Sequence, residues 1–223
     1  MDVMKDLIIV GTGSFAALMK FYVTQYDTRK VAAFSVEQAY INGPFFEELP
    51  VCPLERLTER YASDTYDVLL AIGARNMNKL RERLFRFCKD KGYHVASFIH
   101  PSCVLSPDTK IGEGNIILEN SLTQPFVEIG DGNLFWDNVA ITHNDIIGDF
   151  NTISGGVGLC GFDTVGNYCY LGKYSMVFDN VTLADYTLVG AGAHVKKNTK
   201  PYEVVVPAKS IVLENKKSTD FQV

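Results

Sequence analysis

The chain has 223 residues, 47% of them hydrophobic and 21% charged, which is enough for one large or two small globular domains with a buried core. The formal net charge is −5 and no segment is rich in Lys and Arg, so the composition argues against a nucleic-acid-binding protein, since phosphate contacts need clustered cations.

The sequence also indicates the cellular compartment of the protein. No apolar run approaches the roughly 20 residues of a membrane-spanning helix, and the first residues lack a signal-peptide pattern. The five cysteines show no C-x-x-C spacing, which disfavours a disulfide framework or a zinc site. We therefore expect a cytoplasmic protein with reduced thiols and no membrane span.

The first 97 residues alternate short apolar runs with helical patterns. We expect strands over 7–10, 31–34 and 66–72, helices over 16–26, near 53–55 and over 77–91, and a last strand at 95–99. This order predicts a small Rossmann-like parallel sheet with helices on both faces. We interpret residues 1–97 as a substrate-binding domain and residues 98–223 as a second domain.

Gly11, Gly13 and Ala16 follow the first strand in a G-x-G-x-x-A spacing and open the first helix. This context suits a phosphate bound at a helix amino terminus. Only Glu37 offers an acidic side chain near the second strand, and the segment is too short for a full dinucleotide domain, so a nucleotide-sugar fits better than NAD. A tight turn without a ligand is the alternative.

From Ile99 to Val195 every sixth residue is large and apolar, with Thr123 as the exception. Glycines recur 18 residues apart at Gly112, Gly130, Gly148 and Gly166, and we attribute them to corners with positive φ. A strict period of six, with three periods to a coil, predicts a parallel β-helix rather than a β-sandwich, whose loops vary in length.

His143 is the candidate general base among the 4 histidines. It lies two residues after Ile141, where the repeat turns side chains outward, and imidazole titrates near neutral pH. Asn144 can orient the ring through its amide oxygen, with Asp145 as a second choice. A surface histidine without a role is the alternative. The other histidines of the repeat are too distant in sequence to suggest a metal site, so we expect none.

The chain resembles hexapeptide-repeat sugar acyltransferases of the PglD/NeuD type over nearly its whole length. The matching segments are the glycine turn at 11–16, the segments 71–73, 100–101, 142–150 and 189–193, and the Pro-Ala-Lys at 207–209.

This resemblance implies a left-handed β-helix, a homotrimer, acyl-CoA between neighbouring prisms and an amino sugar on a nucleotide as acceptor. It implies that His143 is the base and that the Gly161 N–H faces the thioester carbonyl. We expect acyl-CoA to contact Thr152, Gly161 and Ala191, and Lys173 as a point charge for its phosphates, with a solvated surface lysine as the alternative for Lys173. We expect the nucleotide-sugar to contact Gly11, Gly13, Ser14, Phe15, Ser35, Gly73 and Trp136.

The chain departs from the family pattern at four places. Asn144 replaces an acidic residue, Phe15 a histidine, Ser35 the start of an acidic pair, and Trp136 a small polar residue. We expect an N-acetyltransferase that uses acetyl-CoA. A sugar O-acetyltransferase of the sialic-acid type and a non-catalytic trimeric nucleotide-sugar-binding protein are the alternatives.

Overall fold

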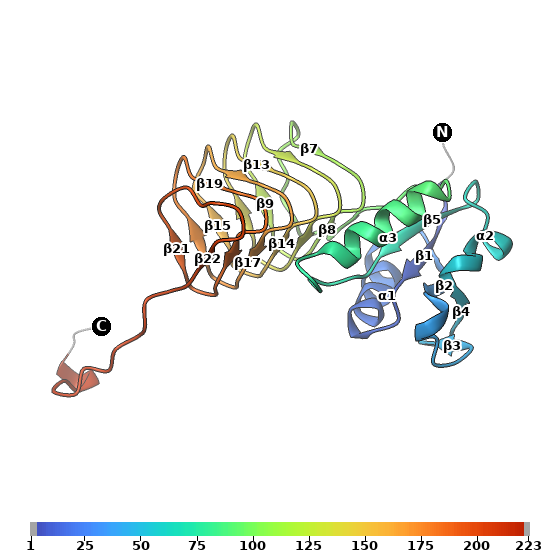
Figure 1. Cartoon of the computed structure of the whole chain (residues 1–223), viewed down its shortest axis with the longest axis horizontal. Helices are drawn as coiled ribbons and strands as arrows, with labels where there is room; N and C mark the ends of the chain where they lie inside the picture. Colours follow the sequence, from blue (N-terminus) through green and yellow to red (C-terminus); the bar gives the residue numbers. More distant parts are fainter. Residues whose placement is uncertain (1–3, 221–223) are drawn as a thin grey trace.

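A computed structural model describes residues 4–220 and shows an α/β part, residues 4–97, attached to a long β-helix (Figure 1). The five-stranded sheet of the α/β part has the order β3-β4-β2-β1-β5. Its elements are β1 (Asp6–Val10), α1 (Ser14–Tyr26), β2 (Val31–Val36), β3 (Phe45–Phe46), β4 (Leu49–Pro53), α2 (Leu57–Arg60), β5 (Tyr66–Leu70) and α3 (Lys79–Asp90), with short 3-10 turns at Gln38–Tyr40 and Leu54–Arg56.

The predicted alternation of strands and helices is largely confirmed, with two corrections. β1, β2, β4 and β5 are parallel, but β3 pairs with β4 in an antiparallel hairpin, for which the sequence predicted no strands. Alternate residues of β1 face opposite sides: Leu7 and Ile9 share a core with α1, whereas Ile8 and Val10 share one with α3. The segment 95–99 does not join this sheet as a strand, since Val95 makes only a single bridge to Val68.

The six-residue repeat forms a parallel β-helix whose coils pair with a register of 18 residues, as at Ile129 and Ile147. Face 1 consists of β6 (Phe98–Ile99), β8 (Ile116–Ile117), β11 (Leu134–Phe135), β14 (Thr152–Ile153), β17 (Tyr170–Leu171), β20 (Leu188–Val189) and β22 (Val204–Val205). Face 2 consists of β9 (Leu122–Thr123), β12 (Ala140–Ile141), β15 (Gly158–Leu159), β18 (Met176–Val177) and β21 (His194–Val195). Face 3 consists of β7 (Lys110–Ile111), β10 (Glu128–Ile129), β13 (Ile146–Ile147), β16 (Thr164–Val165) and β19 (Thr182–Leu183).

The repeat residues fill the prism. From Ile117 to Val195 they are buried, and Thr123 takes its place among them at 6% exposure. Ile99 is 39% exposed because it lies at the open first coil. The arrangement fits the left-handed β-helix that the family resemblance implies.

The corners follow the same period, although the reason we gave for the glycines is wrong. From Gly114 to Gly192 every sixth residue has a positive φ, between 54° and 71°, and many of these residues are Asn, Phe or Tyr. The glycines at 112, 130, 148 and 166 do not have positive φ. They are required by space, because a Cβ on Gly130 would lie 2.9 Å from the Gly148 carbonyl oxygen of the next coil.

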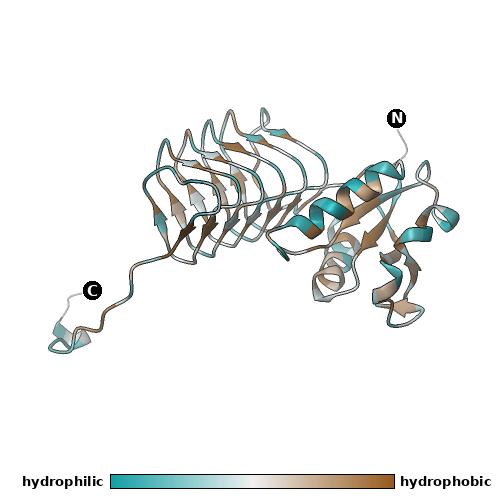
Figure 2. Cartoon of the chain, in the orientation of Figure 1, coloured by the Kyte–Doolittle hydropathy of each residue, from teal (hydrophilic) through white to brown (hydrophobic). Residues whose placement is uncertain are grey.

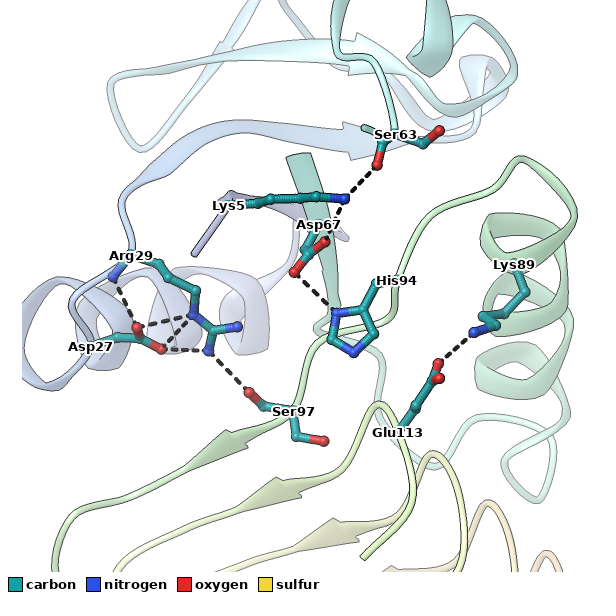
Figure 3. Close-up of polar contacts among 9 residues, drawn as sticks. All are labelled: Lys5, Asp27, Arg29, Ser63, Asp67, Lys89, His94, Ser97 and Glu113. Atoms are coloured by element: carbon teal, nitrogen blue, oxygen red, sulfur yellow. Dashed lines mark hydrogen bonds and ion pairs between the residues drawn. The ribbon is translucent and has the colours of Figure 1, made fainter. Parts of the chain in front are cut away.

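The α/β part covers face 1 at the first coils. Outward residues of that face, Ile116 and Leu134, are buried against Met19 of α1 and Leu69 of β5. Polar contacts fasten the same junction: Arg29 donates to the Ser97 carbonyl at 3.0 Å, and Lys89 pairs with Glu113 at 2.6 Å (Figure 3). The hydrophobic residues of this part concentrate on its strands (Figure 2).

After β22 the chain leaves the prism, and its last described element is a short 3-10 turn at Ser218–Asp220 (Figure 1). Within residues 4–220 no helix is both long and apolar enough to span a membrane.

Candidate active site

His143 lies at the corner between faces 2 and 3, and its side chain is exposed. Its Nδ1 lies 3.2 Å from Oδ1 of Asn144. An amide oxygen only accepts hydrogen bonds, so this contact suits the tautomer with the proton on Nδ1 and the lone pair on Nε2. That tautomer presents the nitrogen that a general base needs.

Asn144 also has a backbone role. Its φ is 63°, and it occupies one of the left-handed corner positions that recur every six residues. Asn tolerates this conformation better than most residues. Both the turn and the bond to His143 therefore suit an asparagine here.

Asp145 supports the same turn from inside the prism. It is 0% exposed, and its two carboxylate oxygens accept the backbone N–H groups of Thr142 at 3.0 Å and Asp163 at 2.9 Å. Burial raises the pKa of this carboxyl group to about 7, against the lowering effect of these bonds. Asp145 thus holds the backbone beside His143 and makes no hydrogen bond to its ring, so its expected second-rank role as orienter is indirect.

Gly161 lies one coil along from His143 and leaves space beside its ring. A Cβ at this position would lie 3.0 Å from Cε1 and 3.2 Å from Nε2 of His143, and the φ of 117° is one that other residues rarely adopt. The carboxylate of Asp163 accepts the Cys160 N–H at 3.1 Å and also interacts with the Gly161 N–H. Gly161 therefore gives access to the basic nitrogen.

The surface around His143 is unusually apolar. Phe126 is 66% exposed, Phe162 is 55% exposed and Ile146 is 48% exposed. The Phe162 ring contacts the His143 ring edge-on, with centroids 5.1 Å apart. Exposed aromatic clusters of this kind mark binding surfaces.

A cavity of about 650 Å³ opens at the carboxyl ends of β1, β2 and β5. Among the predicted substrate residues, it is lined by Gly11, Gly13, Ser14, Phe15 and Gly73. Gly11 is sterically required, because it has a φ of 125° and a Cβ would lie 2.9 Å from the Ala71 carbonyl oxygen. Gly13 and Gly73 have no neighbour within 4 Å of a Cβ, so their small size leaves room for a ligand.

Two predicted substrate residues lie elsewhere. Ser35 is fully buried in β2, where its hydroxyl donates to the Cys52 carbonyl at 3.0 Å, and it does not line the cavity. It is therefore not available to a ligand, and that expectation is corrected. Trp136 belongs to the β-helix and is not part of the cavity lining, but its ring packs 5.5 Å from that of Phe15.

The cavity also contains three cationic residues that we did not single out from the sequence: Arg75, Lys79 and Arg83. Arg83 forms a bidentate pair with Glu37, with both distances 2.9 Å. Lys79 pairs with Glu82 at 3.1 Å. Arg75 is exposed and makes no side-chain hydrogen bond or ion pair within residues 4–220. The spacing of these three residues in the sequence did not predict that they line the cavity, because the sheet topology alone brings them to the glycine turn.

The residues predicted to bind acyl-CoA are dispersed over the prism. Lys173 and Ala191 are exposed at the corner between faces 1 and 2. Thr152 is 2% exposed; its hydroxyl donates to Asn78 at 2.7 Å and accepts a bond from Arg81 at 3.2 Å. The α/β part thus occupies the place where a ligand would have to reach Thr152, and that expectation is corrected.

Within the described part of the chain, no group of three or more His, Cys, Asp or Glu residues is arranged to hold a metal ion.

Comparison with known protein families finds no match. Solved structures resemble the chain over most of its length. The acetyltransferase domain of PglB from Neisseria gonorrhoeae FA1090 has a TM-score of 0.80 at 21% identity, and the match covers 93% of this chain and 100% of that one. WeeI from Acinetobacter baumannii AYE has a TM-score of 0.78 at 20% identity, covering 91% and 97%.

A perosamine N-acetyltransferase from Caulobacter crescentus, solved with CoA and GDP-perosamine after a histidine was replaced by asparagine, has a TM-score of 0.81 at 25% identity and covers 92% of this chain and 94% of that one. The perosamine enzyme is a sugar N-acetyltransferase, and the PglB acetyltransferase domain was also solved with acetyl coenzyme A. The hexapeptide-repeat fold expected from the sequence and the enzyme class, an acyltransferase, are thereby confirmed.

Proposed function

We propose that the protein is an acyl-CoA-dependent N-acyltransferase that transfers an acetyl group from acetyl-CoA to an amino sugar carried by a nucleotide. The observation that carries the proposal is His143 at an exposed corner, with its Nδ1 3.2 Å from Oδ1 of Asn144 and its Nε2 beside the space that Gly161 leaves open. The neighbours with CoA and GDP-perosamine support the substrate classes. The finer assignment to the PglD/NeuD type stays a prediction.

The proposed chemistry uses these groups in order. The amine nitrogen of the sugar attacks the thioester carbonyl carbon while Nε2 of His143 takes a proton from the nitrogen. The bond to Asn144 keeps the ring in the correct tautomer and direction. When the tetrahedral intermediate collapses, the C–S bond breaks and the CoA thiolate leaves, accepting the proton from His143. The family resemblance assigns the developing oxyanion to the Gly161 N–H, and this role would require that N–H to leave the Asp163 carboxylate with which it interacts.

The cavity of the α/β part is the proposed site for the nucleotide. The amino terminus of α1 opens into it with no side-chain cap, and its free N–H groups and dipole favour a phosphate. Gly13 and Gly73 allow close approach, and Arg75 supplies an unpaired positive charge. Phe15 and Trp136 provide an apolar surface for the sugar. We retain residues 1–97 and 98–223 as the proposed domains.

The proposed base, His143, and the cavity of the α/β part lie on different sides of one chain. The α/β part covers face 1, whereas His143 occupies the corner between faces 2 and 3, which is opposite face 1 in a three-sided prism. A nucleotide-sugar bound in the cavity therefore needs the His143 of a second copy. The exposed Phe126, Phe162 and Ile146 around His143 suit such a contact. We propose a homotrimer with acyl-CoA between neighbouring prisms.

Mixing two inactive variants tests this arrangement. His143→Ala lacks the base, and Gly13→Trp blocks the cavity. Co-refolded mixtures should regain part of the wild-type turnover, because some interfaces pair an intact cavity with an intact His143. A mixture that stays as inactive as its components would contradict a site shared between copies.

The acceptor is tested by measuring thiol release from acetyl-CoA with a panel of nucleotide-linked amino sugars and matched hydroxyl sugars, followed by mass analysis of the product. The proposal predicts acetyl transfer to an amine. Transfer to a hydroxyl would instead indicate the O-acetyltransferase, and tight binding of a nucleotide-sugar without thiol release would indicate a binding protein.

A further inference from the structure

Arg81 of α3 is a buried cation that joins the cavity to the β-helix. It is 2% exposed, and its guanidinium makes five hydrogen bonds. Nη1 donates to the carbonyls of Ile72 at 3.1 Å and Gly73 at 3.2 Å, which lie in the cavity wall after β5. Nε donates to the Gly132 carbonyl at 2.7 Å, and Nη2 donates to the Asn151 carbonyl at 2.8 Å.

The fifth bond, from Nη2, goes to the Thr152 hydroxyl at 3.2 Å. All five guanidinium donors are thus used. Gly132 and Asn151 belong to consecutive coils, so one side chain connects the cavity wall to two turns of the prism. No carboxylate within residues 4–220 bonds to Arg81, and burial lowers its pKa to about 9.

Asn78 reinforces this connection. It is 0% exposed, accepts the Thr152 hydroxyl at 2.7 Å and donates to the Cys169 carbonyl at 3.1 Å. It ends a turn in which Asn76, Met77 and Asn78 have φ values of 55°, 44° and 65°. Three consecutive non-glycine residues in this region are costly and persist only where their surroundings hold them. The turn follows Arg75, and both Arg75 and Asn76 line the cavity.

Packing alone does not explain a buried arginine here. An apolar side chain of similar volume would avoid the desolvation of a charge and is often as stable. What the guanidinium adds is direction, since it fixes carbonyl groups from three separate segments in one plane. Two of these segments belong to the β-helix and one to the cavity wall.

We propose that Arg81 is a positioning residue that holds the cavity wall from Ile72 to Asn76 in a fixed place relative to the β-helix, so that a nucleotide-sugar bound there is presented correctly for acyl transfer. The kinetic consequence of this inference rests on the proposed function. The structural role of the Arg81 hydrogen bonds does not.

The test uses full-length Arg81→Lys, which keeps the positive charge but loses the planar guanidinium and its several N–H donors. The control is Arg86→Lys on the same helix, where the arginine side chain is 67% exposed. Arg81→Lys should speed amide hydrogen exchange over residues 72–78 and raise KM for the nucleotide-sugar about tenfold or more. KM for acetyl-CoA should change less than about twofold, and Arg86→Lys should match the wild type in every measurement.

Two outcomes overturn the inference: wild-type exchange together with a wild-type KM for the nucleotide-sugar in Arg81→Lys, or equal changes in both KM values. Should Arg81→Lys fail to fold, the nearly isosteric Thr152→Val removes one hydrogen bond from Arg81 and one from Asn78. This variant should raise KM for the nucleotide-sugar about threefold, and an unchanged KM would overturn the inference. Absence of any transferase activity in the wild type would refute the proposed function. The amide exchange measurement would still show whether Arg81 holds the cavity wall in place.

Discussion

Replacing Gly161 by alanine tests whether the space beside His143 is needed for acyl transfer. The added Cβ would lie 3.0 Å from Cε1 and 3.2 Å from Nε2 of the imidazole, and 3.3 Å from Oγ1 of Thr142. These distances are shorter than ordinary van der Waals contact, so the ring must move by several tenths of an ångström. The methyl group would also fill the space beside Nε2 in which the amine nitrogen and the thioester carbonyl have to meet.

Two separate effects follow. The φ of 117° is unsuited to alanine, and we expect a loss of about 1–3 kcal/mol in the free energy of unfolding. Displacement of the base by a fraction of an ångström to 1 Å should lower kcat/KM by up to about 10²-fold. The stability loss leaves most molecules folded if the protein has the usual 5–15 kcal/mol, so the kinetic effect is not a consequence of unfolding.

The control is Gly192→Ala, which has a positive φ of 70° but no neighbour within 4 Å of a Cβ. It should lose about 1–2 kcal/mol in stability, and it isolates the backbone cost. Denaturant unfolding gives the stabilities of both variants, and thiol release gives kcat/KM for Gly161→Ala. A folded Gly161→Ala enzyme with wild-type kcat/KM would refute the reasoning.

Other substitutions test separate parts of the site. Asn144→Asp keeps a residue that tolerates the turn and adds a negative charge that stabilises the protonated His143 ring. The acid limb of the kcat–pH profile should therefore move to higher pH, and an unmoved limb would mean that residue 144 does not act on His143. Asp145 has a folded-state pKa of about 7 against 3.8 for the free group, so its contribution to stability should fall as pH rises through this window, and thermal unfolding of Asp145→Asn should depend less on pH; equal slopes would contradict this. Gly13→Ala should keep the wild-type Tm, like the loop control Gly43→Ala, but raise KM for the nucleotide-sugar severalfold, and an unchanged KM would remove Gly13 from the site. Ser35→Ala should lose about 1 kcal/mol of stability without changing that KM, whereas a raised KM would restore Ser35 as a substrate residue.

The β-helix could be predicted because its packing is periodic. Each coil repeats the same contact, so the inward position has to be apolar every six residues, and the register can be counted along the chain. The same counting placed His143 outside the core. It could not explain Gly130, which looks like a positive-φ corner in sequence but is required by the close approach of the next coil.

The site residues were harder to predict, because they meet through topology rather than spacing. Arg75 and Arg81 reach the cavity and its wall from a segment far from the glycine turn in sequence. Thr152 has the outward position of a repeat strand, but the α/β part covers that face, which could not be read from the repeat. The outward Ile116 and Leu134 are apolar for the same reason, which was the one sequence signal of the contact.

The most direct test of the central claim is single-turnover acetyl transfer by His143→Ala, mixed with saturating acetyl-CoA and the best nucleotide-linked amino sugar. The account predicts that both substrates still bind with near wild-type affinity, and that the rate of thiol release falls by about 10²–10⁴-fold because the base is missing. A rate within severalfold of the wild type, with both substrates bound, would contradict His143 as the general base.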